Sequence, residues 1–459
     1  MTTTSRAATG HEDTDPGLEE LLREVAPRYR VPGVSVAIAD RGRVRRAVTG
    51  HVSAASAVPV TTATPFPAGS VTKIPAAAIT VSLLEQAGLP LDTPIGVLLP
   101  ALRAAAGEPL GQVTVWHLLT HTSGLDGDHL PVLADGPDVL ERYAHACRDI
   151  TSAFPAGTRF SYCNAGFVLL GAIAERLTGA AWRTLFTRFF VGPLGLRGTR
   201  VAEHRGPGDL VRGHIHDPAT GRLVEDPGWE QPYLAPAGLV VATAGDLLAI
   251  LREVTAGTTG RFAKAASAMA GAGIATPAGH SVPGGVRWTP GWAEWDFDGL
   301  RVLGYNGQIR CQVTQVRVAP GHDFAVVVAT NGLGGDGVAR AVFEHVFARR
   351  FGIRVPPLPP EVPADEHEAP PARAVYAHGD TVLTFGRRAG QPVVSLGYGP
   401  ALAGWSPAAI DEAPLVPVAD GTWAVRWPQA HRTVAFDGPP AGDARPWAHY
   451  DARAFRLRP

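Results

Sequence analysis

The chain has 459 residues, of which 45% are hydrophobic and 18% are charged, and its formal net charge at pH 7 is −1. This length is typical of one large domain joined to a smaller one, and the near-zero net charge argues against nucleic acid or an anionic membrane as a partner. Because no apolar run of about eighteen residues occurs and the polar, acidic N-terminus does not resemble a secretion signal, we expect a cytoplasmic protein without a membrane span.

The chain begins with a predicted disordered tail, residues 1–16, because this stretch is polar and acidic. The apolar spacing within residues 17–30 predicts a helix. The alternating pattern and Arg-Gly turn of residues 33–50 predict a β-hairpin. Small and apolar residues from Ser70 onward are typical of a buried helix that ends at Gly88.

Residues 90–280 alternate helical runs with glycine and proline loops. Three strands are predicted next, at residues 300–307, 311–320 and 323–332. One helix is predicted after them, at residues 337–352. Strands therefore occur at both sequence ends of this region, with helices between them. One sheet built from both ends, with a helical insertion, is the simplest assembly of residues 17–354.

The composition changes after residue 354. Residues 355–371 are rich in proline and acidic residues, which is typical of a stiff linker. Residues 372–459 consist of short alternating segments separated by turn residues. This pattern predicts a small β-barrel or sandwich domain.

Lysine is rare in this chain: the 41 lysines and arginines include two lysines, Lys73 and Lys264. Lys73 comes three residues after Ser70, and residues three apart share one face of a helix. A serine hydroxyl is a weak nucleophile until a base takes its proton. Lysine can act as that base when its pKa is lowered, whereas arginine stays charged. We therefore expect Lys73 to activate Ser70; a chance Ser-Lys spacing is the alternative.

Tyr162 and Asn164 come directly before a predicted helix. A tyrosine can act as a general base if nearby cations lower its pKa, and Lys73 would be such a cation. The Asn164 amide can donate and accept hydrogen bonds. The alternative is a tyrosine packed on the core and an asparagine that caps the helix.

These motifs resemble those of the serine β-lactamase and penicillin-binding-protein superfamily, in its class-C-like branch of esterases, D-amino-acid peptidases and transacylases. The Ser-x-x-Lys motif is Ser70-Val71-Thr72-Lys73 and the Tyr-x-Asn motif is Tyr162-Cys163-Asn164. Further similar stretches run in order over residues 18–350, among them VPGVSVAIADRGRV, VTVWHLLTHTSGL and PAGLVVATAGDLLAI. The resemblance implies an α/β fold with an antiparallel sheet flanked by helices and an all-helical subdomain, followed by a small lipocalin-like β-domain.

The resemblance also implies an acyl-enzyme mechanism in which Ser70 is the nucleophile and Lys73 and Tyr162 share the proton transfers. Asn164 would bind the substrate amide or hold Lys73. The third family motif, a lysine or histidine followed by any residue and glycine, falls at Tyr305-Asn306-Gly307. Tyr305 replaces the usual cation, which argues against recognition of a substrate carboxylate; Arg310 is a candidate substitute. The N–H groups of Ser70 and Gln308 are the expected oxyanion donors.

Other candidate sites carry less weight. His214, His216 and Asp217 form part of a metal-ligand pattern, and His117 and His121 have the i, i+4 spacing of a zinc pair on a helix, but neither set is completed. We expect no metal and no cofactor. The three cysteines, Cys147, Cys163 and Cys311, are too scattered for a disulfide framework. Trp288, Trp292 and Trp295 either line a cleft or pack in the core.

We therefore expect a serine hydrolase or acyltransferase that forms a Ser70 acyl-enzyme from an ester, thioester or amide. The first alternative is a penicillin-binding-protein-type thioesterase that releases a nonribosomal peptide by macrocyclisation. The second is a non-catalytic homologue that binds a peptide. The expected partner is a small-molecule or peptide acyl substrate, free or bound to a carrier protein; the oligomeric state stays open.

Overall fold

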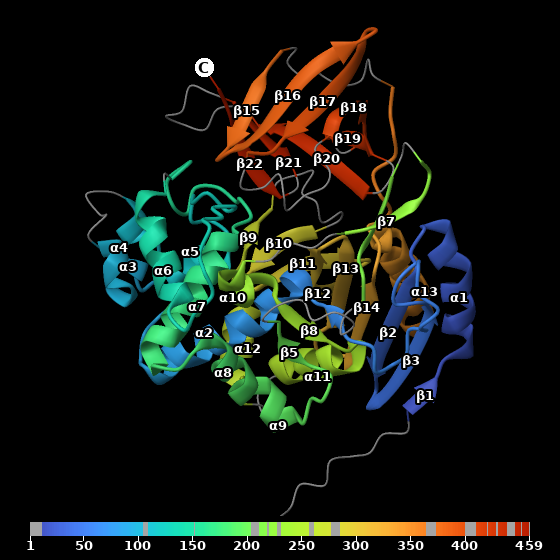
Figure 1. Ribbon diagram of the computed structural model, residues 1–459, viewed down its shortest axis with the longest axis horizontal. Coiled ribbons are helices and arrows are strands. Elements are labelled where there is room, and N and C mark those ends of the chain that lie inside the picture. The colour runs from blue at the N-terminus through green and yellow to red at the C-terminus, as the bar shows by residue number, and fades with distance from the viewer. Residues whose placement is uncertain are drawn as a thin grey trace, which may run out of the picture.

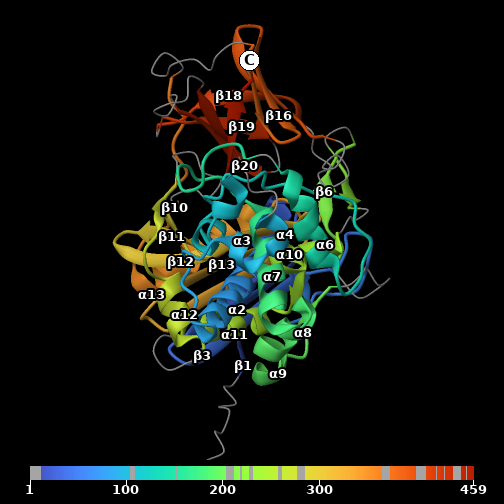
Figure 2. The same cartoon turned by 90° about the vertical axis from the view of Figure 1, so that its left-hand side faces the viewer.

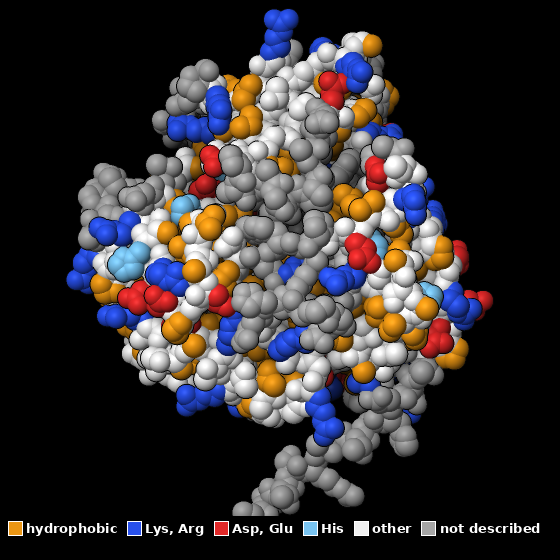
Figure 3. All heavy atoms as spheres, in the orientation of Figure 1, with side chains coloured by type: hydrophobic (Ala, Val, Ile, Leu, Met, Phe, Trp, Pro, Cys, Tyr) orange, Lys and Arg blue, Asp and Glu red, His pale blue; other side chains and the backbone are white. Residues whose placement is uncertain are grey.

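The computed structural model describes most of the chain as two regions, a large α/β region and a C-terminal barrel (Figure 1). The described residues are 12–103, 109–150, 152–202, 211–217, 220–226, 231–256, 261–276, 285–363, 373–399, 410–419, 421–427, 430–437, 446–450 and 452–458. On the face drawn in Figure 3, basic and acidic side chains are interspersed, in keeping with the net charge of −1. Among these residues, no helix has the length and apolar character required to cross a bilayer.

A nine-stranded sheet forms the centre of the large region. Its strands are β1 (Glu12–Thr14), β2 (Gly33–Asp40), β3 (Arg43–Gly50), β9 (Ile274–Ala275), β10 (Gly285–Thr289), β11 (Trp292–Phe297), β12 (Leu300–Ile309), β13 (Gln312–Ala319) and β14 (Phe324–Thr330). Their order is β1-β3-β2-β14-β13-β12-β11-β10-β9. The pair β1–β3 is parallel and the other pairs are antiparallel. Strand β2 pairs with β14, so the sheet joins both sequence ends, as predicted.

Helices cover both faces of this sheet and form a separate helical region beside it (Figures 1 and 2). The helices are α1 (Pro16–Arg28), α2 (Lys73–Gln86), α3 (Ile95–Leu98), α4 (Pro100–Arg103), α5 (Val115–Leu119), α6 (Val139–Ala146), α7 (Asn164–Thr178), α8 (Trp182–Phe186), α9 (Gly192–Leu194), α10 (Ala235–Gly238), α11 (Ala244–Thr255), α12 (Ala263–Met269) and α13 (Gly335–Phe351). Helices α1 and α13 pack together on one face, and α11 packs on β2 and β14 from the other.

Helix α2 lies at the junction of the sheet and the helical region. Every residue from Lys73 to Leu84 is buried, as expected for a helix that is apolar on all sides. It packs against α7, α11 and α12. A short 3-10 helix, η1 (Gly69–Thr72), precedes it, and η1 is anchored by β4 (Phe66–Pro67), which pairs with β8 (Val240–Ala242). The third strand of this small sheet is β5 (Arg200–Val201), and a separate hairpin pairs β6 (His214–His216) with β7 (Leu223–Glu225).

The C-terminal region is a closed antiparallel barrel, which confirms the prediction of a small all-β domain. Its strands are β15 (Val375–His378), β16 (Thr381–Arg388), β17 (Gln391–Gly397), β18 (Ile410–Pro417), β19 (Trp423–Trp427), β20 (Ala430–Asp437), β21 (Trp447–Tyr450) and β22 (Arg453–Leu457). Pairing of β15 with β22 closes the barrel, and closure leaves no exposed strand edge. Strands β20, β21 and β22 lie nearest the α/β region (Figure 1).

Two predictions about flexible segments differ from the structure. Within the predicted tail, residues 12–14 form β1 beside β3, and the Asp15 side chain accepts a hydrogen bond from Leu18 N at 3.1 Å and caps α1. Residues 1–11 lie outside the described part. Within the predicted linker, Val362 N donates to Pro417 O at 3.0 Å, so this part already pairs with the barrel. Residues 364–371 lie outside the described part.

Candidate active site

Ser70 lies in η1, directly before α2, where the sequence motif placed it. Ser70 is half-buried and Lys73 is fully buried, so a substrate can reach the hydroxyl while the amine stays shielded from water. The Lys73 Nζ and Ser70 Oγ atoms are 3.2 Å apart. The spacing of three residues therefore brings the amine and the hydroxyl together, as predicted.

Lys73 Nζ has two further partners, and both of them can only accept a hydrogen bond from it. Nζ donates to Asn164 Oδ1 at 2.8 Å and to the Ala237 carbonyl oxygen at 2.6 Å. A neutral amine has two N–H groups and one lone pair. With both N–H groups used on these oxygens, the lone pair faces Ser70 Oγ, which can donate its proton. An ammonium would instead donate to all three oxygens, Ser70 Oγ included, so the arrangement suits a general base once the amine has lost its proton.

The environment of Lys73 favours this neutral form. Burial lowers the pKa of Lys73 well below its usual value, and the nearby Arg453 guanidinium lowers it further, whereas Asp128 and Cys163 oppose the shift. Burial disfavours an ammonium because the charge loses its hydration. The physical requirement for lysine at this position, a cation that can give up its proton, is thus met.

Tyr162 lies beside Lys73 at the end of the segment before α7. Lys73 Nζ is 5.0 Å from the centre of the Tyr162 ring. Burial raises the pKa of Tyr162, and side-chain hydrogen bonds with Ser70 and Tyr305 and the charge of Arg453 oppose this shift only in part. The hydroxyl is therefore protonated in the resting protein, which suits a proton donor better than the general base that the sequence suggested.

Strand β12 brings the third motif to Ser70. The backbones of η1 and β12 lie so close that a side chain at either glycine would collide with the other segment. A Cβ atom on Gly307 would be 2.2 Å from Ala68 O and 3.1 Å from Ser70 N. A Cβ atom on Gly69 would be 2.9 Å from Gln308 N. Gly69 also has a φ of +52°, which favours glycine. The backbones at Ser70 and Gln308 therefore approach each other closely, as the two expected oxyanion donors require.

The remaining residues of this motif point in opposite directions, because side chains alternate along a strand. The Tyr305 hydroxyl lies 3.4 Å from the Tyr162 hydroxyl. Asn306 faces the other side of the sheet, where its Oδ1 accepts from Arg317 at 2.9 Å, and Arg317 packs over Phe343 of α13. Asn306 is a candidate substrate-binding or oxyanion residue as the middle member of the third motif, but its side chain is turned away from Ser70 by the strand.

Comparison with known proteins agrees with this arrangement. The sequence model of the Beta-lactamase family matches residues 18–349. This chain belongs to the Beta-lactamase family. It is 31% identical over 388 residues to "Penicillin-binding protein 4" of Amycolatopsis lactamdurans, which covers 82% of this chain and 98% of that protein.

Two further relatives extend the comparison. A "D-aminopeptidase" of Cereibacter sphaeroides is 31% identical over 169 residues, which cover 34% of this chain and 31% of that protein. The crystal structure of SurE superimposes with a TM-score of 0.73 at 25% identity, over 96% of this chain and 98% of SurE. The chain is an enzyme of the serine hydrolase superfamily, and the likeness to SurE includes the C-terminal barrel.

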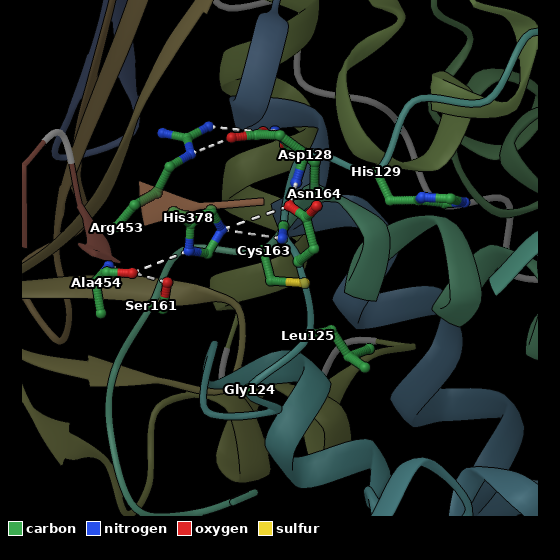
Figure 4. Close-up of polar contacts among 12 residues, drawn as sticks. Gly124, Leu125, Asp128, His129, Ser161, Cys163, Asn164, His378, Arg453 and Ala454 are labelled. Carbon is green, nitrogen blue, oxygen red and sulfur yellow. Dashed lines mark hydrogen bonds and ion pairs between the residues drawn. The ribbon is translucent and has the colours of Figure 1, made fainter. Parts of the chain in front are cut away.

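The structure of this Beta-lactamase family member adds two site residues that the sequence analysis missed, Asp128 and Arg453 (Figure 4). Asn164 Nδ2 donates to Asp128 Oδ1 at 3.0 Å, which orients the amide so that its oxygen faces Lys73. Arg453, on β22 of the barrel, pairs with both carboxylate oxygens of Asp128; its Nη2 lies 2.9 Å from Oδ1. Nothing in the sequence connects residues so far apart in the chain.

Asp128 is ionised in this setting although it is buried. Burial alone would raise its pKa, but the charge and hydrogen bonds of Arg453, with smaller contributions from His378 and Asn164, hold the pKa below its usual value. Arg453 also lies over the Tyr162 ring, with its guanidinium carbon 5.5 Å from the ring centre. One residue of the barrel thus acts on Lys73, Asn164 and Tyr162.

The barrel also holds the backbone of the site. Tyr162 N donates to Ala452 O at 2.8 Å, and Ala454 N donates to Ser161 Oγ at 3.1 Å. His378 Nε2 accepts from Gly127 N at 3.3 Å, next to Asp128 (Figure 4). The Arg432 guanidinium of β20 donates to Gln308 Oε1 at 3.0 Å. The Tyr-x-Asn motif and the end of β12 are therefore both in contact with the barrel.

The histidines and the arginine that were set aside as weaker candidates have hydrogen bonds or positions typical of structural residues. His117 Nδ1 accepts from Thr114 N and completes the cap of α5, and His121 follows the end of that helix in a left-handed conformation, so the pair does not share a helix face. His214 Nε2 accepts from Ala54 N at 3.0 Å. No cluster of three metal-ligating side chains occurs in the described ranges. Arg310 is buried in the turn between β12 and β13.

The tryptophans and cysteines singled out in the sequence lie in the interior. Trp288, Trp292 and Trp295 are all buried. Trp288 nevertheless borders the site, since its ring is 5.2 Å from that of Tyr305, whereas Trp295 lies under Arg317 on the other side of the sheet. The three cysteines are free and buried. Burial raises the pKa of Cys163 to about 11, which keeps this thiol beside the site protonated.

Proposed function

We propose that this protein is an active-site serine hydrolase or acyltransferase that carries its substrate as an acyl group on Ser70. The observation that carries the proposal is the Lys73 amine, buried, 3.2 Å from Ser70 Oγ and held by two acceptors that leave its lone pair for the serine. Burial of a lysine costs free energy of folding, and the lowered pKa that burial causes is what a lysine needs to accept a proton from serine.

In the acylation step, Ser70 Oγ attacks the substrate carbonyl carbon and its proton passes to Lys73. The carbonyl oxygen becomes an oxyanion, which the Ser70 and Gln308 N–H groups stabilise. When the bond to the leaving group breaks, Tyr162 donates its hydroxyl proton to that group. The proton on Lys73 then restores Tyr162 through the hydrogen bonds around Ser70. Water or an amine subsequently attacks the acyl-enzyme, and the same groups transfer protons in the reverse order.

We propose peptide-like acyl groups with a D-configured residue as the substrate class. One support is the relative called D-aminopeptidase, which is 31% identical to this chain over 169 residues. Tyr305 stands where a cation would bind the carboxylate of a penicillin or a D-Ala-D-Ala peptide, which favours esters and amides without a free carboxylate. Acylation rates with paired D- and L-aminoacyl esters test this proposal: a faster D-ester is expected, and equal rates contradict it.

Macrocyclisation of a peptidyl thioester is the second candidate function, and the barrel favours it. Arg453 and the Ala452 carbonyl contact the Tyr162 segment directly, so the barrel borders the proposed site. Exclusion of water favours attack by an amine over hydrolysis. The ratio of cyclic to hydrolysed product from a synthetic peptidyl thioester distinguishes the two functions.

The experiment that tests the proposed function is intact-protein mass measurement after brief mixing with an aryl ester or a peptidyl thioester mimic. Wild type is expected to gain the acyl mass, and Ser70→Ala is expected to gain none. Ser82→Ala, a buried serine in the following helix α2, serves as the matched control and should load like wild type. Absence of both acyl-enzyme and free product with wild type would instead support the non-catalytic, peptide-binding alternative.

A further inference from the structure

Three side chains and one backbone N–H form a line of hydrogen bonds that ends at Tyr162. Cys163 N lies 3.0 Å from His121 Nδ1, and His121 Nε2 lies 3.2 Å from the Tyr305 hydroxyl. The Tyr305 hydroxyl in turn lies 3.4 Å from the Tyr162 hydroxyl. His121 and Tyr305 are fully buried, so water does not compete for these contacts.

The direction of this line follows from its first member. A backbone N–H can only donate, so His121 Nδ1 accepts from Cys163 and carries no proton. The ring proton of a neutral imidazole then lies on Nε2, which donates to the Tyr305 oxygen. With its oxygen accepting from His121, the Tyr305 hydroxyl hydrogen is free to point at Tyr162. Each hydrogen bond thus fixes the direction of the next one.

We propose that His121 is a positioning residue that makes the Tyr305 hydroxyl a hydrogen-bond donor to Tyr162, so that the phenolate formed when Tyr162 protonates the leaving group is stabilised. This inference rests on the proposed function and assigns Tyr305 a use in place of the missing cation. A donor aimed at an oxygen that becomes negative is worth more in the charged state than in the resting state.

The packing around this line supports a positioning role. The His121 ring stacks on the Tyr162 ring with centroids 4.3 Å apart, and Trp288 contacts His121 edge-on at 4.9 Å. A φ of +57° at His121 shows that the backbone adopts an uncommon conformation to place this ring. The ionisable groups that face Tyr162 are Lys73, Arg453 and Asp128 in addition to Ser70 and Tyr305.

The leaving group provides the test, because a poor leaving group needs the Tyr162 proton and a good one does not. The measurement is kcat/KM for a D-aminoacyl methyl ester and the matching nitrophenyl ester. For Tyr305→Phe we expect the methyl ester to lose about 10- to 100-fold and the nitrophenyl ester to lose about 3-fold or less. A general packing defect would lower both esters alike, and that result would overturn the proposal.

His121→Asn extends the test, since asparagine tolerates the left-handed backbone but is too short to reach Tyr305. We expect the same selective loss on the methyl ester, and no further loss when His121→Asn is combined with Tyr305→Phe. Losses that multiply in the double variant would contradict action through Tyr305. Tyr233→Phe, another fully buried tyrosine, is the matched control and should leave the ratio of the two esters unchanged.

The experiments distinguish a failure of the role proposed for His121 and Tyr305 from a failure of the proposed function. If wild type gives neither an acyl-enzyme nor free product, the proposed function fails and the ratio of the two esters cannot be measured. If wild type is acylated and Tyr305→Phe shows the wild-type ratio of the two esters, the proposed function stands and the role of Tyr305 and His121 is wrong.

Discussion

At the scale of single residues, the chemistry depends on which proton each buried group holds. The pKa of Lys73 is lowered, which favours its neutral amine, because burial removes the hydration of its ammonium and Arg453 repels the charge. Tyr162 is protonated because burial penalises its phenolate. Burial therefore favours the neutral amine of Lys73, whereas an exposed lysine is charged. It also favours the neutral hydroxyl of Tyr162 over the phenolate that a tyrosine base would need. Arg317, buried in the same protein, has its pKa lowered by burial to about 9 and faces away from the site.

Lys73→Arg tests the residue-scale argument directly. Arginine retains a charge at this position but cannot release its proton under working conditions. We expect kcat/KM to fall by about 100-fold or more, as for loss of a general base, while Lys264→Arg leaves it unchanged. Steady-state kinetics on an aryl ester measure both variants, and full activity of Lys73→Arg would show that the lysine does not carry a proton.

The pH dependence of acylation tests the same point through Arg453. In Arg453→Met the repulsion that lowers the pKa of Lys73 is lost and the Asp128 carboxylate is left without its partner, and both changes raise the pKa of Lys73. Lys73 must be neutral to act, so the acid limb of the kcat/KM profile should move to higher pH. An acid limb at the wild-type position would contradict this assignment.

At the scale of elements, the site depends on the contact between η1 and strand β12. Two glycines allow it: Gly69 adopts a positive φ, and Gly307 has the Ala68 carbonyl where a Cβ would stand. Pro67 O accepts from Thr314 Oγ1 at 2.9 Å, and Ala68 N donates to Val240 O at 2.8 Å. The turn that carries Ser70 is thus held by the sheet on one side and by β8 on the other.

Gly307→Ala should separate the two backbones, because the added methyl group would lie 2.2 Å from Ala68 O. We expect kcat to fall by about 100-fold, the scale for loss of one oxyanion donor, with a lower melting temperature. Gly386→Ala, in barrel strand β16, has its closest neighbour at 3.6 Å and is the matched control. Wild-type kcat in Gly307→Ala would exclude this oxyanion hole.

At the scale of the whole molecule, the barrel is part of the active site. The path Arg453, Asp128, Asn164, Lys73 runs from the last barrel strand to the base, and each contact is a direct hydrogen bond or ion pair. The side chains of Arg453 and Asp128 are 12% and 6% exposed. Removal of one partner leaves a buried charge without compensation, which is strongly destabilising.

Stability against acid reports on this ion pair. The pKa of Asp128 is lower in the folded protein than its ordinary value of 3.8. The stabilisation is therefore complete above that value and is lost as the pH falls through the folded-state pKa. We expect Asp128→Asn to lower the melting temperature at pH 7 and to differ less from wild type as the pH is lowered below about 4.

The matched control for this stability measurement is Glu412→Gln. Glu412 pairs with Arg388, whose side chain is 78% exposed, and exposed pairs contribute little. Melting curves from pH 7 to pH 3 compare the three proteins. A difference between Asp128→Asn and wild type that stays constant over this range would show that the carboxylate does not contribute through its charge.

Much of the architecture follows from local sequence patterns. The spacing of apolar residues predicts α1, α2 and α13, and alternation predicts β2, β3 and β12–β14 and most of the barrel strands. The patterns fail where long-range contacts decide: residues 12–14 are polar, yet they form β1 because β3 offers an edge. Strands β10 and β11 were not predicted, although they extend the same sheet.

The sequence alone predicts the members of the proposed reaction centre that lie within short motifs, namely Ser70, Lys73, Tyr162 and Asn164, since helix and turn geometry depend on neighbours in the chain. Only the tertiary structure decides that Asp128 and Arg453 orient this centre, that His121 and Tyr305 point toward Tyr162, and that Asn306 turns away. The physical reason is that burial and charge act through space. Arg453 lowers the pKa of Lys73 although the two residues are 380 positions apart in the chain.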